Sequence, residues 1–184
     1  VDLSINVTIN KKNYCEVGDL INYLVELGVR EISFTRLYFA GSAIKNFNDL
    51  TLNSKEYALF LKDILRKYSD VVSIKLHGPL PPPYLKKYSL ELPNYPSCVA
   101  GVSELTIGPQ GDYFLCPSSD KKLGSFKQTN IFNFWNSENF TYYRKRNNLP
   151  KKCLICDDFS NCNGGCILFV DGDPLCPKSI FFRI

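Results

Sequence analysis

The chain has 184 residues, of which 45% are hydrophobic and 22% are charged, as in an ordinary globular protein. These proportions exclude an intrinsically disordered chain and a fibrous repeat. A formal net charge of +4 is too small for a dedicated nucleic-acid binder, and no apolar run is long enough for a transmembrane helix. We therefore expect neither nucleic acid nor a membrane as partner. No secretory leader is visible, and we expect a cytoplasmic protein.

Cysteine and methionine are the two unusual features of the composition. Eight cysteines is a high number for a cytoplasmic domain, and seven of them lie between Cys98 and Cys176. Methionine is absent altogether, even from the first position. Because translation starts with methionine, we expect the chain to be part of a longer protein whose missing part lies upstream.

Residues 1–80 are predicted to alternate between strands and helices. Alternating apolar side chains predict strands at residues 3–9, 31–39 and 71–76. Such an order predicts parallel strands joined by right-handed crossovers. Three parallel strands alone leave an edge and a face uncovered, so we expect a slice of a larger α/β barrel or open sheet.

Two amphipathic helices are predicted between these strands. Asp19 can cap the first helix, which Gly28 ends, and Asn53 or Ser54 can cap the second. The apolar stripes are expected to comprise Leu20, Tyr23, Leu24 and Leu27 in the first helix, and Tyr57, Phe60, Leu61, Ile64 and Tyr68 in the second.

A proline-rich segment divides the chain. Three consecutive prolines at 81–83 favour an extended polyproline conformation and predict a linker over residues 81–94. The composition changes after this segment, and residues 95–184 are expected to form a second, small α+β domain rich in cysteine and glycine.

Seven cysteines of this second part have the spacing of a metal-binding site. Two of them form a CxxC pair, which lets two sulfurs face the same ion or cluster. The seven are Cys98, Cys116, Cys153, Cys156, Cys162, Cys166 and Cys176.

Three kinds of site compete for these cysteines. A disulfide framework requires an oxidising compartment, for which the sequence has no signal. Structural zinc takes four ligands, often with histidine, and the single histidine is the distant His77. Two iron–sulfur clusters, held by four and three cysteines, would use all seven, and we favour this interpretation. Cys15 stands alone and is expected to be an ordinary small apolar residue.

The spacing and its surroundings resemble the SPASM domain, the C-terminal extension of radical S-adenosylmethionine (SAM) enzymes that modify peptides and proteins. The resemblance covers residues 95–178 and includes a strand–turn–strand–cysteine hairpin at residues 105–116, with Pro109 and Gly111 in the turn. It also includes the segment 123–146 between the cysteine groups. Residues 1–80 are similar to strands four to six of the six-stranded radical SAM partial barrel. The expected fold is therefore a portion of a partial (β/α)6 barrel followed by a SPASM domain.

The resemblance implies how the cysteines are shared between two auxiliary [4Fe–4S] clusters. Cys98, Cys116 and Cys166 would hold the first cluster. The second would be held by Cys153, Cys156, Cys162 and Cys176. The fourth position of the first cluster would be open, or taken by a side chain such as Asp112 or Asp120.

The resemblance also implies SAM binding. Ser4 and Asn6 on the first strand and Arg36 on the second are candidate SAM contacts that could point into the barrel lumen. The family's Cys-x3-Cys-x2-Cys loop, which holds the SAM-cleaving third cluster, is absent here. We therefore expect the isolated chain to be inactive and the parent protein to be the oxidoreductase. No residue of this chain is assigned a catalytic role.

The resemblance implies that the parent protein modifies a peptide or protein by radical chemistry and takes electrons from a ferredoxin or flavodoxin. The two auxiliary clusters would relay electrons and position the substrate. Two alternatives remain open: a zinc-stabilised recognition module for a peptide or protein, without activity, and a stand-alone electron-transfer protein.

Overall fold

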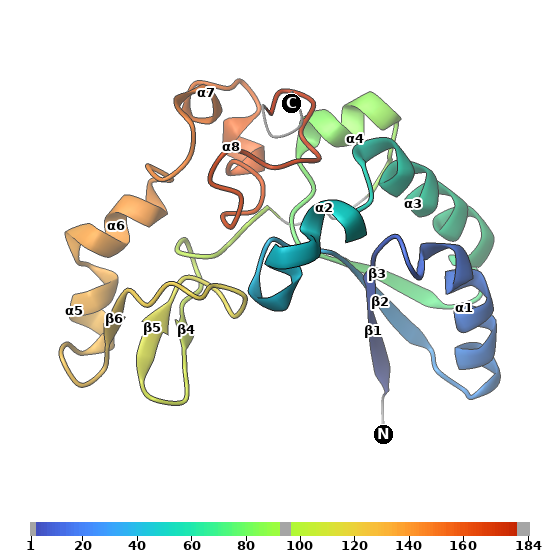
Figure 1. The fold of residues 1–184 in the computed structure, drawn as a ribbon, viewed down its shortest axis with the longest axis horizontal. Coiled ribbons are helices and arrows are strands. Elements are labelled where there is room, and N and C mark those ends of the chain that lie inside the picture. Colours follow the sequence, from blue (N-terminus) through green and yellow to red (C-terminus); the bar gives the residue numbers. More distant parts are fainter. Residues whose placement is uncertain (1–2, 93–96, 180–184) are drawn as a thin grey trace.

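The computed structural model describes residues 3–92 and 97–179, which form a sheet-and-helix part and a cysteine-rich part (Figure 1). The first part contains strands β1 (Ser4–Ile9), β2 (Glu31–Arg36) and β3 (Ser73–His77). They form one parallel sheet in the order β1-β2-β3, as predicted. Strand β2 ends at Arg36 rather than at residue 39, because its last partner on β1 is Ile9.

Helices α1 (Val17–Glu26) and α3 (Ser54–Tyr68) lie on the same side of this sheet (Figure 1). The predicted apolar stripe of α1 is wrong in part. The buried residues are Val17, Ile21 and Leu24, whereas Tyr23 and Leu27 are 59% and 63% exposed. The helix begins before Asp19, which lies in its first turn instead of capping it, and the buried stripe is shifted accordingly.

Helix α3 has the predicted cap and the predicted buried stripe. The Asn53 side chain accepts hydrogen bonds from the backbone N–H groups of Lys55 and Glu56, both at 2.9 Å. The Glu56 carboxylate in turn accepts from the Asn53 backbone N–H at 2.8 Å, which completes a capping box. The residues buried beneath the helix are Tyr57, Ala58, Phe60, Leu61 and Ile64.

Substituting the cap, Asn53→Ala, is expected to lower the free energy of unfolding by about 1 kcal/mol, because two backbone donors lose their acceptor. Chemical denaturation of the chain measures this change. The control Lys55→Ala removes an exposed side chain from the same turn and is expected to have little effect. Equal stability of the Asn53→Ala variant and the unmodified chain would contradict the role of the cap.

The proline-rich segment is not an extended linker, so that part of the predicted organisation is wrong. Helix α4 (Pro82–Tyr88) begins at the second of the three prolines, with Pro81 as its N-cap. Proline fits the first turn of a helix because the N–H groups there have no intrahelical partner. Tyr84 and Leu85 are buried in the core of the sheet-and-helix part. The rest of the predicted linker includes residues 93–96, which lie outside the described residues.

Short helices connect the remaining elements of the first part. They are η1 (Tyr14–Glu16) before α1, and η2 (Gly41–Asn46) and α2 (Phe47–Leu50) between β2 and α3. Phe47 of α2 is 2% exposed, and its ring centroid lies 5.7 Å from that of Phe169 in the cysteine-rich part. The connection after β2 therefore packs against the second part of the chain.

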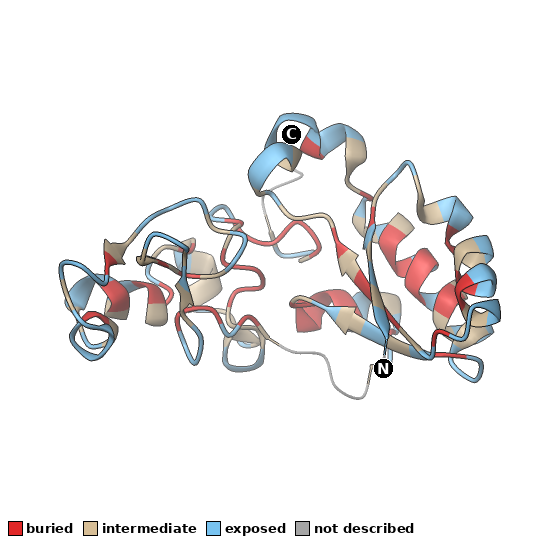
Figure 2. Ribbon diagram, turned by 90° about the horizontal axis from the view of Figure 1, so that it is seen from below, coloured by how far each residue is buried: buried red, intermediate tan, exposed pale blue. Residues whose placement is uncertain are grey.

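The two faces of the parallel sheet differ in character. The face toward α1 and α3 carries Ile32 and Phe34, both 0% exposed, and its buried residues extend into the helices (red in Figure 2). The other face carries polar side chains, including Ser4 and Asn6, which are exposed. Leu175, far away in the sequence, joins the core of this first part. The chain therefore returns to the sheet after passing through the cysteine-rich part.

The cysteine-rich part contains a small antiparallel sheet of β4 (Thr106–Ile107), β5 (Asp112–Phe114) and β6 (Gly124–Ser125). Gly111, with φ of +82°, forms the β4–β5 turn, and Cys116 follows β5, so the predicted hairpin is confirmed. Helices α5 (Ile131–Trp135) and α6 (Glu138–Arg144) pack beside it through Tyr113, Phe134 and Phe140.

Two four-residue helices, α7 (Lys151–Leu154) and α8 (Phe159–Cys162), complete the cysteine-rich part. The longest helix within residues 3–92 and 97–179 is α3, and none there is long and apolar enough to cross a membrane.

Candidate metal centre

Four of the predicted cysteines surround one cavity of about 240 Å³. Cys153 lies on α7, Cys162 ends α8, and the other two lie in the segments that follow these helices. We call these four the second cysteine set; they are Cys153, Cys156, Cys162 and Cys176. None of the remaining described cysteines lines this cavity.

Local backbone turns place the second set. The Cys156 N–H donates to the Cys153 carbonyl at 3.2 Å, so the CxxC segment forms a tight turn, and both of its cysteines line the cavity. The Gly165 N–H donates to the Cys162 carbonyl at 3.1 Å, and the backbone N–H groups of Gly164 and Gly165 near the Cys162 thiol act to lower its pKa. Gly165 has φ of +75°, and a Cβ atom there would lie 2.5 Å from the Asp173 side chain. Only glycine fits this close approach.

The other three predicted ligands form the first cysteine set, which consists of Cys98, Cys116 and Cys166. Cys98 and Cys166 are 8% and 5% exposed, and Cys116 is half-buried. Burial raises the pKa of Cys116, and it raises the pKa of Cys166 to about 12; the neighbouring Cys98 acts in the same direction on both. Cys98 therefore lies close to both other members of its set.

The thiols of the second set also raise one another's pKa. Burial raises the pKa of Cys162 to about 12, and nearby Cys176 adds to the effect. Burial also raises the pKa of Cys176, and the nearby Cys153 and Cys156 raise it further. The two sets are those named in the sequence analysis, although the ligation of a cluster by each stays a prediction. Burial thus disfavours the thiolate forms of Cys116, Cys153, Cys162, Cys166 and Cys176 in the metal-free chain.

The donor set around the cavity fits an iron–sulfur cluster. Thiolate sulfur is the protein ligand of such clusters, and four thiols line this cavity. Backbone N–H groups of Gly164 and Gly165 near the Cys162 thiol favour its thiolate form. Across residues 3–92 and 97–179, no three Cys, His, Asp or Glu side chains are already arranged around a single metal ion.

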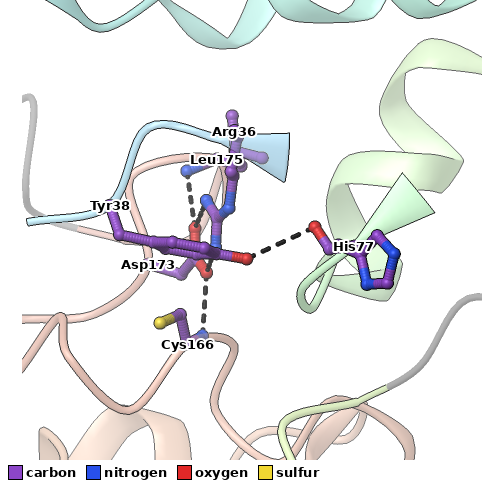
Figure 3. A network of polar contacts seen from close by, with 6 residues as sticks. All are labelled: Arg36, Tyr38, His77, Cys166, Asp173 and Leu175. Carbon is purple, nitrogen blue, oxygen red and sulfur yellow. Dashed lines mark hydrogen bonds and ion pairs between the residues drawn. The ribbon is translucent and has the colours of Figure 1, made fainter. Parts of the chain in front are cut away.

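A buried ion pair between Arg36 and Asp173 joins the two parts of the chain beside the first set (Figure 3). Arg36 Nη1 donates to Asp173 Oδ1 at 2.7 Å, and Nη2 donates to Oδ2. The same carboxylate accepts from the backbone N–H of Cys166 at 2.9 Å and from that of Leu175 at 3.0 Å. A single carboxylate thus fixes the end of β2, the Cys166 loop and the returning chain.

Aromatic rings enclose this ion pair. The Arg36 guanidinium lies 5.5 Å from the centroid of the Tyr38 ring and 5.3 Å from that of the Phe169 ring. The Tyr38 hydroxyl donates to the His77 carbonyl at 3.3 Å, which links β2 to the end of β3 (Figure 3). Sequence reasoning missed Asp173. Its position between the last two cysteines, next to Gly172 and Pro174, was the only signal available.

The three candidate SAM contacts do not share one face of the sheet. Ser4 and Asn6 are on the exposed polar face, where the Thr35 hydroxyl donates to Asn6 Oδ1 at 2.9 Å. Arg36 is in register with the buried Ile9 and is therefore on the opposite face from Ser4 and Asn6. The alternation of side chains along β2 causes this difference. SAM binding at Ser4, Asn6 and Arg36 stays a prediction.

Asp112 and Asp120, the two acidic candidates for the fourth position of the first cluster, lie in different environments. Asp112 pairs with Lys122 at 2.7 Å, and this contact holds the pKa of its carboxyl below the usual range. Asp120 is exposed. A third carboxylate, Glu104, is close enough to Cys116 to raise the pKa of that thiol further.

Comparison with known proteins places these observations in a family context. Residues 98–162 match SPASM, the "Iron-sulfur cluster-binding domain". PqqA peptide cyclase from Ruegeria pomeroyi is 25% identical over 198 residues, a match that covers 100% of this chain and 50% of that protein.

Two solved structures share the fold. SuiB from Streptococcus suis with bound S-adenosylmethionine is similar with a TM-score of 0.65 and 16% identity, over 95% of this chain and 44% of that chain. SuiB has also been solved bound to the precursor peptide SuiA. The structure of anSMEcpe with bound AdoMet and the Cp18Cys peptide is similar with a TM-score of 0.55 and 15% identity, over 89% of this chain and 47% of that chain.

These matches agree with the α/β fold, the hairpin and the cysteine pattern described above. The chain spans about half the length of the curated relative and of the solved structures that it matches. The chain is therefore similar to a SPASM iron–sulfur cluster-binding domain over residues 98–162, to a PqqA peptide cyclase over its whole length, and to SuiB in fold.

Proposed function

We propose that the two cysteine sets hold two [4Fe–4S] clusters that relay electrons and position the substrate during radical modification of a peptide. The observation that carries this proposal is the cavity lined by Cys153, Cys156, Cys162 and Cys176, none of the other three predicted ligands being among its lining residues. Removing a hydrogen atom from a peptide leaves a radical, and its oxidation requires an acceptor for one electron. A bound cluster supplies that acceptor.

The longer protein would bind SAM and carry the third cluster that cleaves it. Support comes from the SAM bound to SuiB and to anSMEcpe, and from their peptide complexes. On this chain, Ser4 and Asn6 would contact SAM from the exposed face of the sheet. A ferredoxin or flavodoxin would supply electrons. The zinc-module alternative is less well supported, because residues 98–162 match an iron–sulfur cluster-binding domain.

Serine substitution of single cysteines tests the proposal. The chain is to be purified anaerobically, loaded with iron and sulfide, and analysed for both elements and for its absorption spectrum. Cys162→Ser and Cys166→Ser are separated by only three residues but belong to different sets. Each is expected to lose about half of the iron and to leave the other cluster intact, because each cluster depends on its own thiolates.

Cys15→Ser is the matched control, because Cys15 is exposed and lies outside both sets. It is expected to retain all iron and sulfide. Zinc without sulfide in the unmodified chain would overturn the proposal. Loss of all iron from every one of the seven single variants would argue against two independent clusters.

A further inference from the structure

Arg146, just after helix α6, is a buried cation without a counter-charge. Its side chain is among the largest that are fully buried, with 1% exposure. Nη2 donates to the Cys98 carbonyl at 2.5 Å. Nε and Nη1 are buried and have no hydrogen-bond partner. Within residues 3–92 and 97–179, no carboxylate lies at ion-pair distance from this guanidinium.

The chemistry of arginine makes this arrangement unfavourable as it stands. A guanidinium group does not lose its proton in a protein, so burial cannot be relieved by neutralisation. Folded proteins pair their buried charges because an uncompensated one forfeits its hydration. The orphaned Nε and Nη1 groups therefore point to an anion that completes this site.

The end of helix α6 sets the backbone of Arg146. Arg146 has φ of +58° and is the left-handed residue that ends the helix: its N–H donates to the Tyr143 carbonyl at 2.9 Å, and the Asn147 N–H donates to the Tyr142 carbonyl at 3.1 Å. The neighbouring Tyr143 packs in the same small core as Cys98, and its Cβ lies 3.8 Å from where a Cβ on Gly101 would be. The segment that carries Arg146 is thus packed directly against the Cys98 loop.

The backbone carbonyl of Cys98 accepts hydrogen bonds from two side chains, one of which lies next to the second cysteine set. It accepts a hydrogen bond from Arg146 and a second one, at 3.2 Å, from the Nδ2 atom of Asn163. Asn163 directly follows Cys162, a member of the second set. Arg146 therefore lies beside a ligand of the first set and contacts the same carbonyl as the loop of the second.

We infer that Arg146 is the counter-charge of a cluster held by Cys98, Cys116 and Cys166. This inference rests on the proposed function, since it requires a cluster at the first set. A [4Fe–4S] core bound by three thiolates is an anion in both of its ordinary redox states. A cation beside it offsets this charge and stabilises the reduced form more strongly, because that form is the more negative. The unfilled Nε and Nη1 donors are available to the sulfur atoms of the cluster or to its fourth ligand.

Arg144 offers a matched control two residues away. Its guanidinium lies over the rings of Trp135 and Phe140, at 4.8 and 5.6 Å from their centroids, and Nη2 donates to the Trp135 carbonyl. The ring faces already stabilise this cation. Arg144 thus shares with Arg146 its type and its place near the end of α6, but it is only half-buried, its guanidinium lies on two ring faces, and it leaves one buried donor, Nε, unpaired where Arg146 leaves two.

The experiment compares Arg146→Met, Arg146→Lys and Arg144→Met in the full chain. Each variant is loaded anaerobically, its iron and sulfide are counted, and its clusters are titrated by electron paramagnetic resonance. Comparison with Cys98→Ser identifies the signal of the first-set cluster. In parallel, the metal-free chains are unfolded in urea.

Arg146→Met is expected to lower the potential of the first-set cluster, or to lose that half of the iron, without changing the second cluster. The same variant is expected to make the metal-free chain more stable, because it removes an uncompensated charge. Arg146→Lys keeps the charge and is expected to retain the cluster and to stay near the original potential. Arg144→Met is expected to leave both potentials unchanged.

The opposite pattern identifies a purely structural arginine. If Arg146→Met destabilises the metal-free chain and leaves the first-set potential unchanged, Arg146 only holds the Cys98 loop and the inference is overturned. Failure of the proposed function is distinct from this result, because the unmodified chain would then bind no iron and sulfide at the first set. That outcome overturns the inference together with the proposed function.

Discussion

Replacing Asp173 by asparagine is expected to lower the free energy of unfolding by about 3–5 kcal/mol, one of the largest effects of any single substitution in this chain. The variant leaves the Arg36 guanidinium buried without its anion. It also weakens the acceptor for the N–H groups of Cys166 and Leu175. Because Asp173 is 2% and Arg36 5% exposed, water cannot replace the lost partner.

Urea denaturation of the metal-free chain, followed by circular dichroism, measures this effect. Asp63→Asn is the control, because Asp63 pairs with Arg66 and Lys67 on the exposed surface of α3. Exposed pairs contribute about 0–1 kcal/mol, so a small change is expected there. A double variant, Arg36→Leu with Asp173→Leu, is expected to recover part of the loss since no charge stays buried. A change below about 1 kcal/mol for Asp173→Asn would contradict the importance of the pair.

Removing iron from the loaded chain with an anaerobic chelator is expected to open the segment 151–163. This segment carries three members of the second cysteine set but contains no buried residue, and its helices α7 and α8 have four residues each. It therefore lacks an apolar core, and metal ligation would supply its stability. Tryptic cleavage after Lys151 and Lys152 is expected to accelerate at least about tenfold, which corresponds to about 1.4 kcal/mol of local stability.

Cleavage after Lys62 provides the control within the same sample. Lys62 lies on α3, whose buried face packs in the large core of the sheet-and-helix part, independently of any metal. Its cleavage rate is expected to stay the same after chelation. Unchanged cleavage after Lys151 and Lys152 would show that the segment holds together without metal. An equal acceleration at all three lysines would instead show that the chain unfolds as one unit.

Local sequence patterns predicted the elements whose stability is mostly local. The strands, the Asn53 capping box and the β4–β5 hairpin were found because their signals lie within a few neighbouring residues. The predictions failed where packing competes with local preference. The prolines at 81–83 suit either an extended segment or a first helical turn, and burial of Tyr84 and Leu85 favours the helix.

The cysteines of the candidate centre could be named from their spacing alone, but the groups around them could not. Arg36 and Asp173 are 137 positions apart, and neither belongs to a local motif with the other. The face of Arg36 depends on its register with Ile9, which only the paired strands define. Arg146 follows Arg144 and Lys145 in the sequence, where no local pattern marks it for burial, and its burial follows from the packing of α6 against the Cys98 loop.

The sequence by itself determined which residues are the candidate metal ligands, because thiol spacing constrains what a short loop can ligate. It also determined the parallel α/β order of the first part, because alternating strand and helix patterns permit few arrangements. Only the tertiary structure decided which thiols share a cavity and which charges are buried beside them. Those relations join distant segments, and their energies depend on the exclusion of water, which arises only when the segments pack together.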